Sequence, residues 1–336
     1  MKIYVAMSGG VDSSTCAYLL KQQGYEIIGL TVLLYDNYPY DEPKKLCKRL
    51  GIEHIVLDLK QDFQQNIIDD FNEKIKNGET PVPCVLCNRH IKLGKLLEFC
   101  ENNNGKLATG HYAIIENNKI YKAKDCLKDQ THFLCDIKKS AIQNLIFPLG
   151  KYLKSEVFRI AKEQNLVDIP TYKESQEVCF FHGKSYNDYV KSLNIEEQNG
   201  EIKHIATNKI LGKHNGLLKY TIGQRQGIGV AWTEPLYVVK RDFEKNILYV
   251  GEEDELYSKE LYIKDINFLV DEFENLDSFK CKVCLRDKTP LLDAEIIKEN
   301  NNQAKVILQE PARAITSGQW CVMYQENMLI GGGKII

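Results

Sequence analysis

The chain lacks two features that would place it in or across a membrane. No apolar run approaches the ~20 residues that a membrane-spanning helix requires. Residues 1–6 pass directly from an apolar strand pattern into a glycine turn, without the apolar core or the small-residue cleavage site of a signal peptide. We therefore expect a soluble, cytoplasmic protein that makes no membrane contact.

An excess of one charge sign is also absent. Lysine and arginine number 44 and aspartate and glutamate 46, which gives a formal net charge of −2. Overall charge therefore does not predict nucleic-acid binding, and such a partner would need a local basic patch. Four basic stretches are candidates for such a patch: Lys44-Lys45, Lys48-Arg49, Arg89–Lys95 and Lys280–Lys288. We expect about half of them to be ordinary solvated surface.

Internal repeats are missing too, and the first half of the chain instead alternates apolar runs with helical patterns. The 336 residues are enough for two or three domains, and 43% of them are hydrophobic. The predicted strands are 2–7, 26–34, 54–59 and 106–109, and the predicted helices are 13–23, 42–50, 63–77 and 88–102. This alternation predicts an α/β fold with a parallel sheet covered by helices on both faces.

The pattern changes in the second half. Residues 152–193 look helical around a loop at 171–183, and short alternating runs follow. We predict strands at 217–222, 236–240, 247–250, 261–268, 279–285, 293–298, 304–308, 319–324 and 328–330, with turns at 299–302 and 326–327. The chain then divides into an α/β domain with a helical extension (1–193), a small central β domain (194–255) and a C-terminal β domain (256–336).

A candidate phosphate loop, S-G-G-V-D-S at residues 8–13, stands between the first strand and the first helix. A glycine turn at a helix N-terminus presents several backbone N–H groups to one anion, most naturally a phosphate. Asp12 would repel that phosphate unless Mg²⁺ bridged them. The loop matches neither the Walker pattern nor the dinucleotide pattern, because no lysine follows the glycines and the spacing differs. The alternative is a tight turn in which Asp12 or Ser13 caps the helix.

Eleven cysteines are an odd number in a long chain, which favours metal, redox or catalytic thiols over a disulfide framework. Two C-x-x-C pairs, at 84–87 and 281–284, could form a Cys₄ zinc site, although their separation far exceeds the ~12–20 residues of a compact zinc module. The second pair also fits a strand in which Cys281 and Cys284 face opposite ways. We expect the remaining cysteines, other than Cys179, to be small buried or partly buried side chains. They are Cys16, Cys47, Cys100, Cys126, Cys135 and Cys321.

Cys87 and Cys179 are the candidate reactive thiols. Cys87 follows a proline-rich turn and precedes a helix that we expect to begin at Asn88 and that carries Arg89, His90 and Lys92. A thiol at a helix N-terminus beside cations has a depressed pKa, so we predict a thiolate near neutral pH. Cys179 lies in a predicted loop with aromatic and polar neighbours, a common setting for functional residues.

Together these segments resemble the bacterial tRNA-uridine 2-sulfurtransferases, or tRNA-specific 2-thiouridylases, of the N-type ATP pyrophosphatase superfamily. The similarity runs nearly end to end and includes A-T-G-H-Y at 108–112 and Y-T-I-G-Q-R-Q-G-I-G at 220–229. The other matching segments are 6–13, 80–88, 128–134, 177–183, 317–319 and 331–333. The resemblance implies an ATP pyrophosphatase domain followed by two small β-rich domains, the last of them a β-barrel.

The resemblance also implies an activity, in which uridine at the tRNA wobble position is adenylated on O2 and thiolated from a cysteine persulfide. Cys87 would be the nucleophile and Cys179 the persulfide carrier, with a disulfide formed during turnover. The expected ATP-binding residues are Ala6, Met7, Ser8, Gly9, Gly10, Val11, Asp12, Ser13, Val32 and Gly110. The expected tRNA-binding residues are His111, Lys128, Asp129, Gln130 and Gln319.

By the same resemblance the cofactors are ATP and Mg²⁺, with no metal held by protein ligands alone. The expected partners are the lysine, glutamate and glutamine tRNAs and a persulfide donor such as a cysteine desulfurase or a sulfur relay protein. A second adenylating chemistry would also fit the phosphate loop, because other ATP pyrophosphatases activate a carbonyl to form an amide or amidine. Such an enzyme would have no use for Cys87 and Cys179. A third alternative is a tRNA-binding protein, zinc-stapled or degenerate, without catalysis.

The sequence departs from the family pattern at three places, one of which is the segment 33–42, usually longer and acidic but short here. Val82 and Cys84 stand where the family has asparagine and aspartate, and Cys84 could compete with Cys87 for disulfide formation. In the C-terminal domain, Cys284-Leu285-Arg286 replaces an R-Y-R segment, so one expected tRNA contact is largely lost. These changes indicate a divergent member with the same fold.

Overall fold

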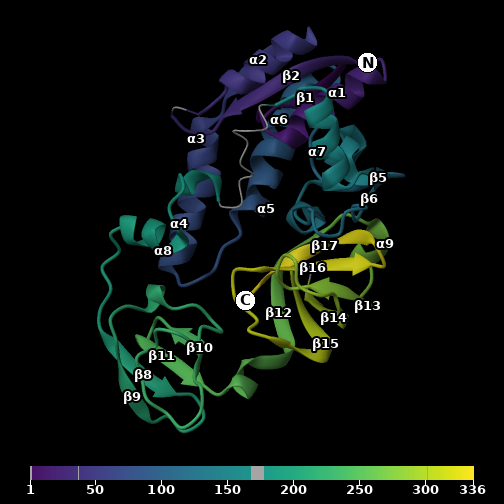
Figure 1. The fold of residues 1–336 in the computed structure, drawn as a ribbon. Coiled ribbons are helices and arrows are strands. Elements are labelled where there is room, and N and C mark those ends of the chain that lie inside the picture. The colour runs from purple at the N-terminus through teal and green to yellow at the C-terminus, as the bar shows by residue number, and fades with distance from the viewer. Residues whose placement is uncertain (1, 37, 168–177, 301) are drawn as a thin grey trace.

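The computed structural model describes residues 2–36, 38–167, 178–300 and 302–336. The chain forms three bodies, which Figure 1 separates clearly. An α/β body occupies the top of the view, a small green β body lies at the lower left, and a yellow-green barrel lies at the lower right. Among the helices of the described residues, none is both long and apolar enough to cross a membrane.

The α/β body is built on a five-stranded sheet of order β3-β2-β1-β4-β7. Every neighbouring pair in this sheet is parallel, as the alternation of strands and helices predicts. The strands are β1 (Lys2–Ala6), β2 (Glu26–Leu33), β3 (Glu53–Asp58), β4 (Gly105–Ala108) and β7 (Leu145–Ile146). The first four match the predicted strands closely, whereas the two-residue β7 is too short to predict.

Helices cover both faces of this sheet, since successive strand residues point to opposite sides. Ile3 and Val5 pack against α1, α2 and α7, while Tyr4 packs against the helices of the other face. The first group is α1 (Val11–Gln22), α2 (Asp41–Leu50) and α7 (Lys154–Glu163). The second group is α3 (Lys60–Phe63), η1 (Gln64–Asp69), α4 (Asp70–Lys76), α5 (Pro83–Cys87), η2 (Asn88–Lys95) and α6 (Leu96–Asn102).

The helix around Cys87 begins earlier than the sequence suggests. Pro83 occupies the first helical position, where its missing N–H costs nothing, and the helix then runs without a break through α5, η2 and α6. The middle segment η2 is a π-helix, as is η1 on the neighbouring helix. The prediction that a helix starts at Asn88 is therefore wrong by five residues.

The central β body is a four-stranded sheet of order β10-β11-β8-β9. Its strands are β8 (Gly200–His204), β9 (Ile210–His214), β10 (Tyr237–Asp242) and β11 (Ile247–Gly251), and α8 (Tyr186–Ser192) precedes them. The predicted strand at 217–222 is wrong, because residues Leu217–Lys219 form the 3₁₀ turn η8. Leu217 and Leu218 are both buried, which alternating strand faces would not allow, and the Leu218 N–H donates to Glu197 Oε1 at 2.6 Å.

The C-terminal body is a closed six-stranded barrel, because β12 pairs with β17 at the two ends of the order β12-β15-β14-β13-β16-β17. The strands are β12 (Tyr257–Phe268), β13 (Ser278–Cys284), β14 (Leu292–Asn300), β15 (Gln303–Arg313), β16 (Trp320–Gln325) and β17 (Met328–Ile335). The predicted turn at 326–327 is confirmed, since Gln325 pairs with Met328. The predicted turn at 299–302 includes residue 301, which lies outside the described residues, as does most of the predicted loop at 171–183.

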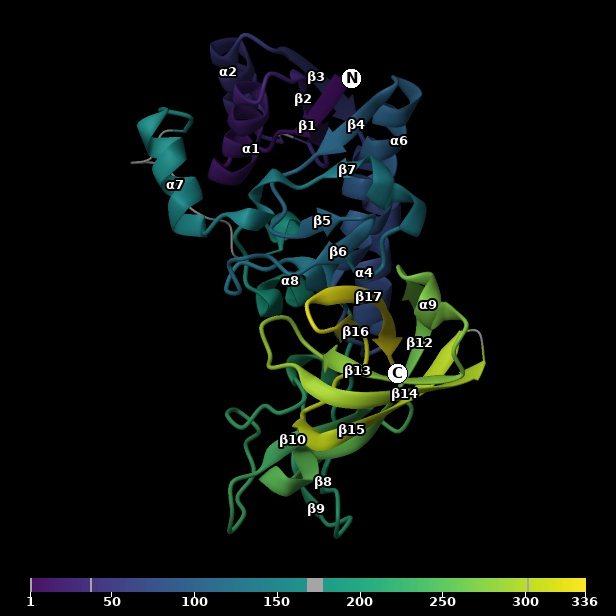
Figure 2. The same ribbon diagram turned by 90° about the vertical axis from the view of Figure 1, so that its right-hand side faces the viewer.

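A short hairpin joins the barrel to the α/β body. Strands β5 (Ile114–Glu116) and β6 (Lys119–Tyr121) follow β4, and Tyr121 of β6 pairs with Met328 of β17. Figure 2 shows this hairpin lying between the parallel sheet and the barrel. The barrel therefore packs beneath the helices that carry the candidate thiols. Shorter elements complete the chain: η3 (Thr131–Leu134), η4 (Lys139–Asn144), η5 (Pro148–Lys151), η7 (Cys179–Phe181), η9 (Glu253–Leu256) and α9 (Asp271–Glu274).

Candidate functional site

The loop between β1 and α1 is held by its own serines. Ser13 Oγ donates to the Gly10 carbonyl at 3.1 Å and accepts from the Ser8 N–H at 3.2 Å. Gly9 has a φ of +82°, and a Cβ there would lie 2.9 Å from Cδ of Pro43. The N-cap of α1 is Gly10, and no side chain caps this helix. The alternative in which Asp12 or Ser13 caps the helix is therefore wrong.

Asp12 is paired with a lysine that the sequence analysis did not select. Lys154 Nζ lies 2.8 Å from both carboxylate oxygens of Asp12, and the Tyr112 hydroxyl donates to the same carboxylate at 2.8 Å. Gly110 packs against the loop from β4, since a Cβ there would lie 3.0–3.1 Å from atoms of Asp12 and Ser13. The carboxylate thus has a cation beside it within the protein, and the expected Mg²⁺ stays a prediction.

One signal in the sequence points to Lys154. It is the first residue of α7, where the helix dipole is positive and a lysine is unfavourable without a compensating anion. Of the other residues expected to bind ATP, Met7 and Val11 are buried in the core, while Ala6 and Val32 are half-buried. Met7 and Val11 therefore offer only their backbone to a ligand.

Cys84, Cys87 and Cys179 converge on one region from two distant parts of the chain. Cys84 and Cys87 lie one turn apart on α5, and Cys179 begins η7. Cys87 is 6% exposed and lies in the same core cluster as Phe180 and Phe181, the two residues that follow Cys179. Cys84 and Cys179 are exposed. The buried thiol therefore lies behind two exposed ones.

The charges around these thiols differ from the prediction. Burial raises the pKa of Cys87 to about 12, Lys92 opposes that rise, and the charges of Cys179 and Cys84 would add to it. Cys84 and Cys179 have surface open to solvent, but the surrounding protein still partly desolvates them. This desolvation raises the pKa of both thiols, again against the effect of Lys92. The predicted low-pKa thiolate at Cys87 is therefore wrong in this structure. The helix begins at Pro83, so Cys87 lies a full turn inside it and is buried.

Lys92 is the cation shared by the three thiols. In a π-helix, residues five apart lie roughly above one another, because the hydrogen bonds join residues i and i+5. The π-helical segment η2 thereby brings Lys92 onto the side of the helix that carries Cys87. Burial lowers the pKa of Lys92, but the negative charge that Cys87, Cys84 and Cys179 carry when ionised outweighs this effect, so the pKa of Lys92 is raised.

An aromatic group that sequence reasoning missed adjoins Cys179. The rings of Tyr35 and Tyr38 lie 5.1 Å apart, and the ring of His182 lies 4.6 Å from that of Tyr35. Burial raises the pKa of both tyrosines, and the charge of Cys179 would raise it further. Tyr35 and Tyr38 follow β2 in a segment that carries no motif, whereas His182 belongs to the matching segment 177–183 but had no role assigned to it, so only the tertiary structure brings the three together.

His111 connects the phosphate loop to the thiols, although it was expected to contact tRNA. Its ring is buried, and Nδ1 lies 2.6 Å from Oγ1 of Thr109. Burial lowers the pKa of His111 to about 3, and the charge of Lys92 lowers it further. Lys92 is thus within electrostatic range of both His111 and Cys87, and Gly110 beside His111 contacts the phosphate loop.

Two further residues that were expected to contact tRNA are engaged in bonds within the protein. Asp129 accepts from the Ala123 N–H at 2.8 Å and from the Thr131 hydroxyl at 2.6 Å. Gln130 Oε1 accepts from the Tyr112 N–H at 3.0 Å. These bonds hold the segment that follows β6 against the α/β body. Lys128, next to them, is half-buried.

Gln319 ties the barrel to the turn before α5. Its Nε2 donates to the Thr80 carbonyl at 2.9 Å, and the Thr80 N–H donates to the Ser317 carbonyl at 3.0 Å. From the central body, Arg241 donates to the Gly78 carbonyl at 2.8 Å. All three bodies therefore meet at residues 78–80, directly before the helix that carries Cys84 and Cys87.

The Cys₄ zinc alternative is wrong. Among the described residues, which include all eleven cysteines, no group of histidine, cysteine or carboxylate side chains is arranged to hold a metal ion, and no disulfide is present. Cys281 lies inside the barrel, whereas Cys284 faces the α/β body, as strand alternation predicts. The remaining cysteines are buried as expected, except that Cys126 is exposed.

Several of the candidate basic stretches are engaged within the protein. Arg49 donates to the Leu166 carbonyl at 3.0 Å, and Arg89 pairs with Asp136 at 2.8 Å. The Arg89 pair borders a hollow of about 360 Å³ between α5 and the barrel.

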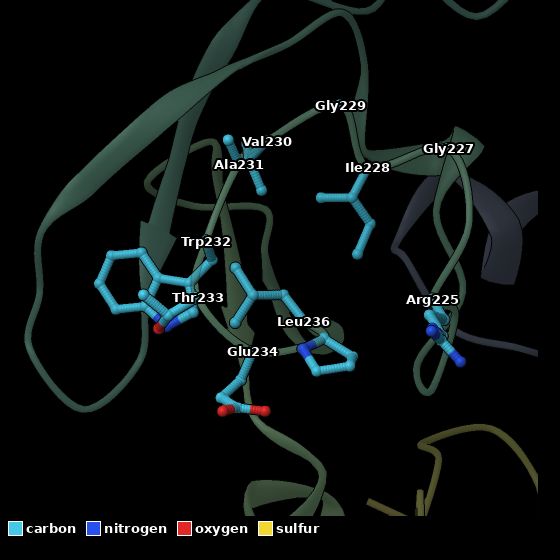
Figure 3. A pocket seen from close by; sticks show the side chains of 11 residues that line it. Arg225, Gly227, Ile228, Gly229, Val230, Ala231, Trp232, Thr233, Glu234 and Leu236 are labelled. Carbon is cyan, nitrogen blue, oxygen red and sulfur yellow. The ribbon is translucent and has the colours of Figure 1, made fainter.

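A second hollow, of about 500 Å³, lies in the central body and is lined by residues 225–236. Figure 3 shows Trp232 and Arg225 at opposite sides of it. None of the residues assigned above to ATP or to the thiols lines this hollow.

Comparisons with known proteins agree with the three bodies. Residues 1–183 match the tRNA methyl transferase HUP domain, 187–252 the tRNA methyl transferase PRC-barrel domain, and 258–335 the aminomethyltransferase β-barrel domain. The tRNA-specific 2-thiouridylase MnmA of Hydrogenobaculum sp. is 41% identical and that of Aquifex aeolicus 39% identical. These alignments cover 100% of this chain and 100% and 99% of the respective relatives.

Two solved structures align with 57% of this chain at low similarity. A U34-tRNA thiolase, NcsA from Methanococcus maripaludis, which carries an iron–sulfur cluster, is 20% identical over 65% of its own length, with a TM-score of 0.37. A 4-thiouridine synthetase in complex with RNA and ATP is 16% identical over 49% of its length, also with a TM-score of 0.37. The full-length matches at about 40% identity show that this chain belongs to the family of tRNA-specific 2-thiouridylases, which are tRNA sulfurtransferases.

Proposed function

We propose that this protein adenylates O2 of the wobble uridine of tRNA with ATP and replaces that oxygen by sulfur, giving 2-thiouridine. The observation that carries the proposal is the convergence of Cys87 and Cys179 beside Lys92, in the body that also holds the phosphate loop. An ATP pyrophosphatase that forms amides would use ammonia or an amine instead, and would not need this pair of thiols.

The phosphate loop supplies the activating step. Backbone N–H groups of residues 8–13 and the hydroxyls of Ser8 and Ser13 would hold the phosphates of ATP. Lys154 neutralises Asp12, which allows the anionic nucleotide to approach. Attack of uridine O2 on the α-phosphorus expels pyrophosphate, so the carbonyl oxygen becomes part of an adenylate, a good leaving group.

The fit of Mg²⁺ to this loop is limited by its donor set. Asp12 is the one carboxylate in the loop, and both its oxygens already contact Lys154. An ion bound with ATP would therefore be held chiefly by phosphate oxygens and water, with Asp12 at most as one ligand, as is common for Mg²⁺. Its contribution would be to neutralise the departing pyrophosphate.

The thiols act after adenylation. Cys179 is exposed and would receive the sulfur as a persulfide from a donor such as a cysteine desulfurase or a sulfur relay protein. The terminal sulfur attacks C2 of the uridine and AMP leaves, which joins C2 to Cys179 through two sulfur atoms. The Cys87 thiolate then attacks Cys179 Sγ, releasing 2-thiouridine and leaving a Cys87–Cys179 disulfide. Lys92 favours the thiolate that this attack requires.

Recognition of tRNA would use residues from separate parts of the chain. Gln319 lies at the meeting point of the three bodies, Lys128 lies in the segment after β6, and both are candidates for phosphate or base contacts. His111 and Asp129 are engaged internally, so they would support the site by packing rather than by touching RNA. We propose the lysine, glutamate and glutamine tRNAs as substrates and the cytoplasm as the location, following the family resemblance.

Mass spectrometry of nucleosides from tRNA incubated with the protein, ATP, Mg²⁺ and a persulfide donor tests this function. We expect 2-thiouridine at the wobble position, with one AMP formed for each sulfur introduced. AMP formed with an aminated uridine would favour the amide-forming alternative. Binding of tRNA with neither AMP nor thiouridine would favour the non-catalytic alternative.

A further inference from the structure

Cys84 is the thiol to which the proposed function gives no role. It occupies a position where the family pattern has a carboxylate, and it lies one turn before Cys87 on α5. Cys84 is exposed, whereas Cys87 is 6% exposed. An exposed thiol therefore adjoins a buried thiol on the same helix.

Helix geometry places Cys84 and Cys87 close to bridging distance. Residues three apart in a helix share one face, with their Cβ atoms roughly 5–6 Å apart. A disulfide needs Cβ atoms about 3.5–4.5 Å apart, so the first turn of the helix must bring the two Cβ atoms about 1–2 Å closer. The charge of Cys84 also acts on both Cys87 and Cys179, which places the three sulfurs in one cluster.

We propose that Cys84 is a resolving thiol, which opens the Cys87–Cys179 disulfide left by each sulfur transfer and passes the oxidation to an outside dithiol. The inference rests on the proposed function. Cys84 Sγ attacks Cys87 Sγ, a Cys84–Cys87 disulfide forms, and Cys179 leaves as a thiolate that takes up a proton. This exchange moves the disulfide without any net change of electrons. An external dithiol then reduces the Cys84–Cys87 disulfide and is itself oxidised to a disulfide.

The arrangement gives the relay a physical advantage over direct reduction. Attack by Cys84 is intramolecular and so has a high effective concentration, whereas an external dithiol can approach this disulfide only at Cys179, because its Cys87 half is buried. The exchange returns Cys179, the proposed persulfide carrier, to its thiol form first. Lys92 lies beside all three thiols and favours each thiolate as it forms. Cys179 can thus receive a new persulfide sulfur while the disulfide between Cys84 and Cys87 is still waiting to be reduced.

The first test compares single and repeated turnover in the full-length protein. We expect persulfide-loaded Cys84→Ser and Cys84→Asp to make as much 2-thiouridine in one turnover as the wild type. With dithiothreitol as the only reductant, their steady-state rate should fall about tenfold, because the intramolecular step is lost. Cys126→Ser, which removes an exposed thiol outside the cluster, should keep both rates. Wild-type steady-state turnover in Cys84→Asp would overturn the relay.

A second test needs no tRNA and so separates the relay from the proposed function. The wild-type protein is oxidised with diamide, blocked with an alkylating agent and digested with trypsin, which leaves Cys84 and Cys87 in one peptide, residues 77–89. We expect that peptide to carry an internal disulfide, and Cys84→Ser to give a Cys87–Cys179 cross-link instead. A stable Cys87–Cys179 cross-link in the wild type would overturn the proposal. So would stoichiometric iron or zinc bound to these thiols in the purified protein, because ligated thiolates are not available for exchange.

Discussion

The phosphate loop is completed largely by its neighbours in the sequence, whereas the thiol cluster is assembled from two segments far apart in the chain. In the loop, Ser8, Gly10 and Ser13 bond to one another, and one distant residue, Lys154, is added. In the cluster, Cys87 shares a core with Phe180 and Phe181, the exposed Cys179 directly precedes them, and Lys92 lowers the pKa of both thiols against the effect of burial. The comparison teaches that neighbouring residues can fix the geometry of a short loop, whereas the pKa of a thiol depends on its burial.

The two regions are nevertheless connected. Gly110 packs against Asp12, its neighbour His111 is buried, and Lys92 acts electrostatically on both His111 and Cys87. We therefore expect the loop to perform the activating step and the thiols the sulfur step, as separable functions of one site. The following variants are designed to break or sharpen that separation.

The largest effect is expected for the two thiols. Cys87→Ser and Cys179→Ser should each lower 2-thiouridine formation by at least roughly 10³-fold, because a hydroxyl neither carries persulfide sulfur nor attacks a disulfide. AMP formation in the presence of tRNA should fall only a few-fold. Cys126→Ser is the control, and both products are counted in the same reaction. Thiouridine made by Cys179→Ser would refute the division of labour.

The loop should show the opposite pattern. Asp12→Ala and Lys154→Met should lower AMP formation by about 100-fold, the size typical of losing one electrostatic contact at a reacting centre. Binding of tRNA, followed by filter retention, should be unchanged. Lys151→Met is the matched control, because Lys151 lies one turn away and pairs with Glu116 at 2.8 Å instead. An equal loss in Lys151→Met would show that charge near α7, and not the pair with Asp12, is what matters.

Binding of tRNA should depend on salt despite the net charge of −2. If three phosphates are neutralised, the log–log slope is about −2.7, and affinity falls about 40-fold between about 50 and 200 mM salt. Titrations with labelled tRNA across this range measure the slope. A flat curve would mean that the internally paired arginines, such as Arg49 and Arg89, leave no effective basic patch.

The smallest effect concerns His111, between the two regions. Burial lowers its pKa to about 3, from 6.5, so below pH 6.5 the unfolded chain takes up a proton that the folded chain does not. Stability is therefore lost as the pH falls, by about 2 kcal/mol at pH 5. Asp136, whose pKa burial raises to about 6, acts in the opposite direction but equally in wild type and His111→Gln. Urea unfolding at pH 7.5 and pH 5 should show that extra loss in the wild type alone; an equal loss in the variant would assign it elsewhere.

Local patterns predicted the fold better than they predicted the site. The parallel strands follow from apolar runs that alternate with helical patterns, and most C-terminal strands follow from short alternating runs, both of which depend only on neighbouring residues. The closure of the last strands into a barrel was implied by the family resemblance. The strand at 217–222 failed because Leu217 and Leu218 are buried together in a turn. At the site, the phosphate loop was a local motif, but Lys154, Tyr35 and Tyr38 enter through tertiary contacts. The predicted thiolate at Cys87 was wrong for two reasons. The helix begins at Pro83, and burial raises the pKa of Cys87 by more than the charge of Lys92 lowers it.

The most direct test of the account follows the uridine oxygen itself. A tRNA carrying oxygen-18 at O2 of the wobble uridine is incubated with wild-type protein, ATP, Mg²⁺ and a persulfide donor, and the AMP is examined by mass spectrometry. If the loop adenylates O2 before the thiols deliver sulfur, the label passes to AMP, one atom for each 2-thiouridine made. Unlabelled AMP accompanied by 2-thiouridine would contradict the account, because oxygen would then have left by a route that does not pass through the adenylate.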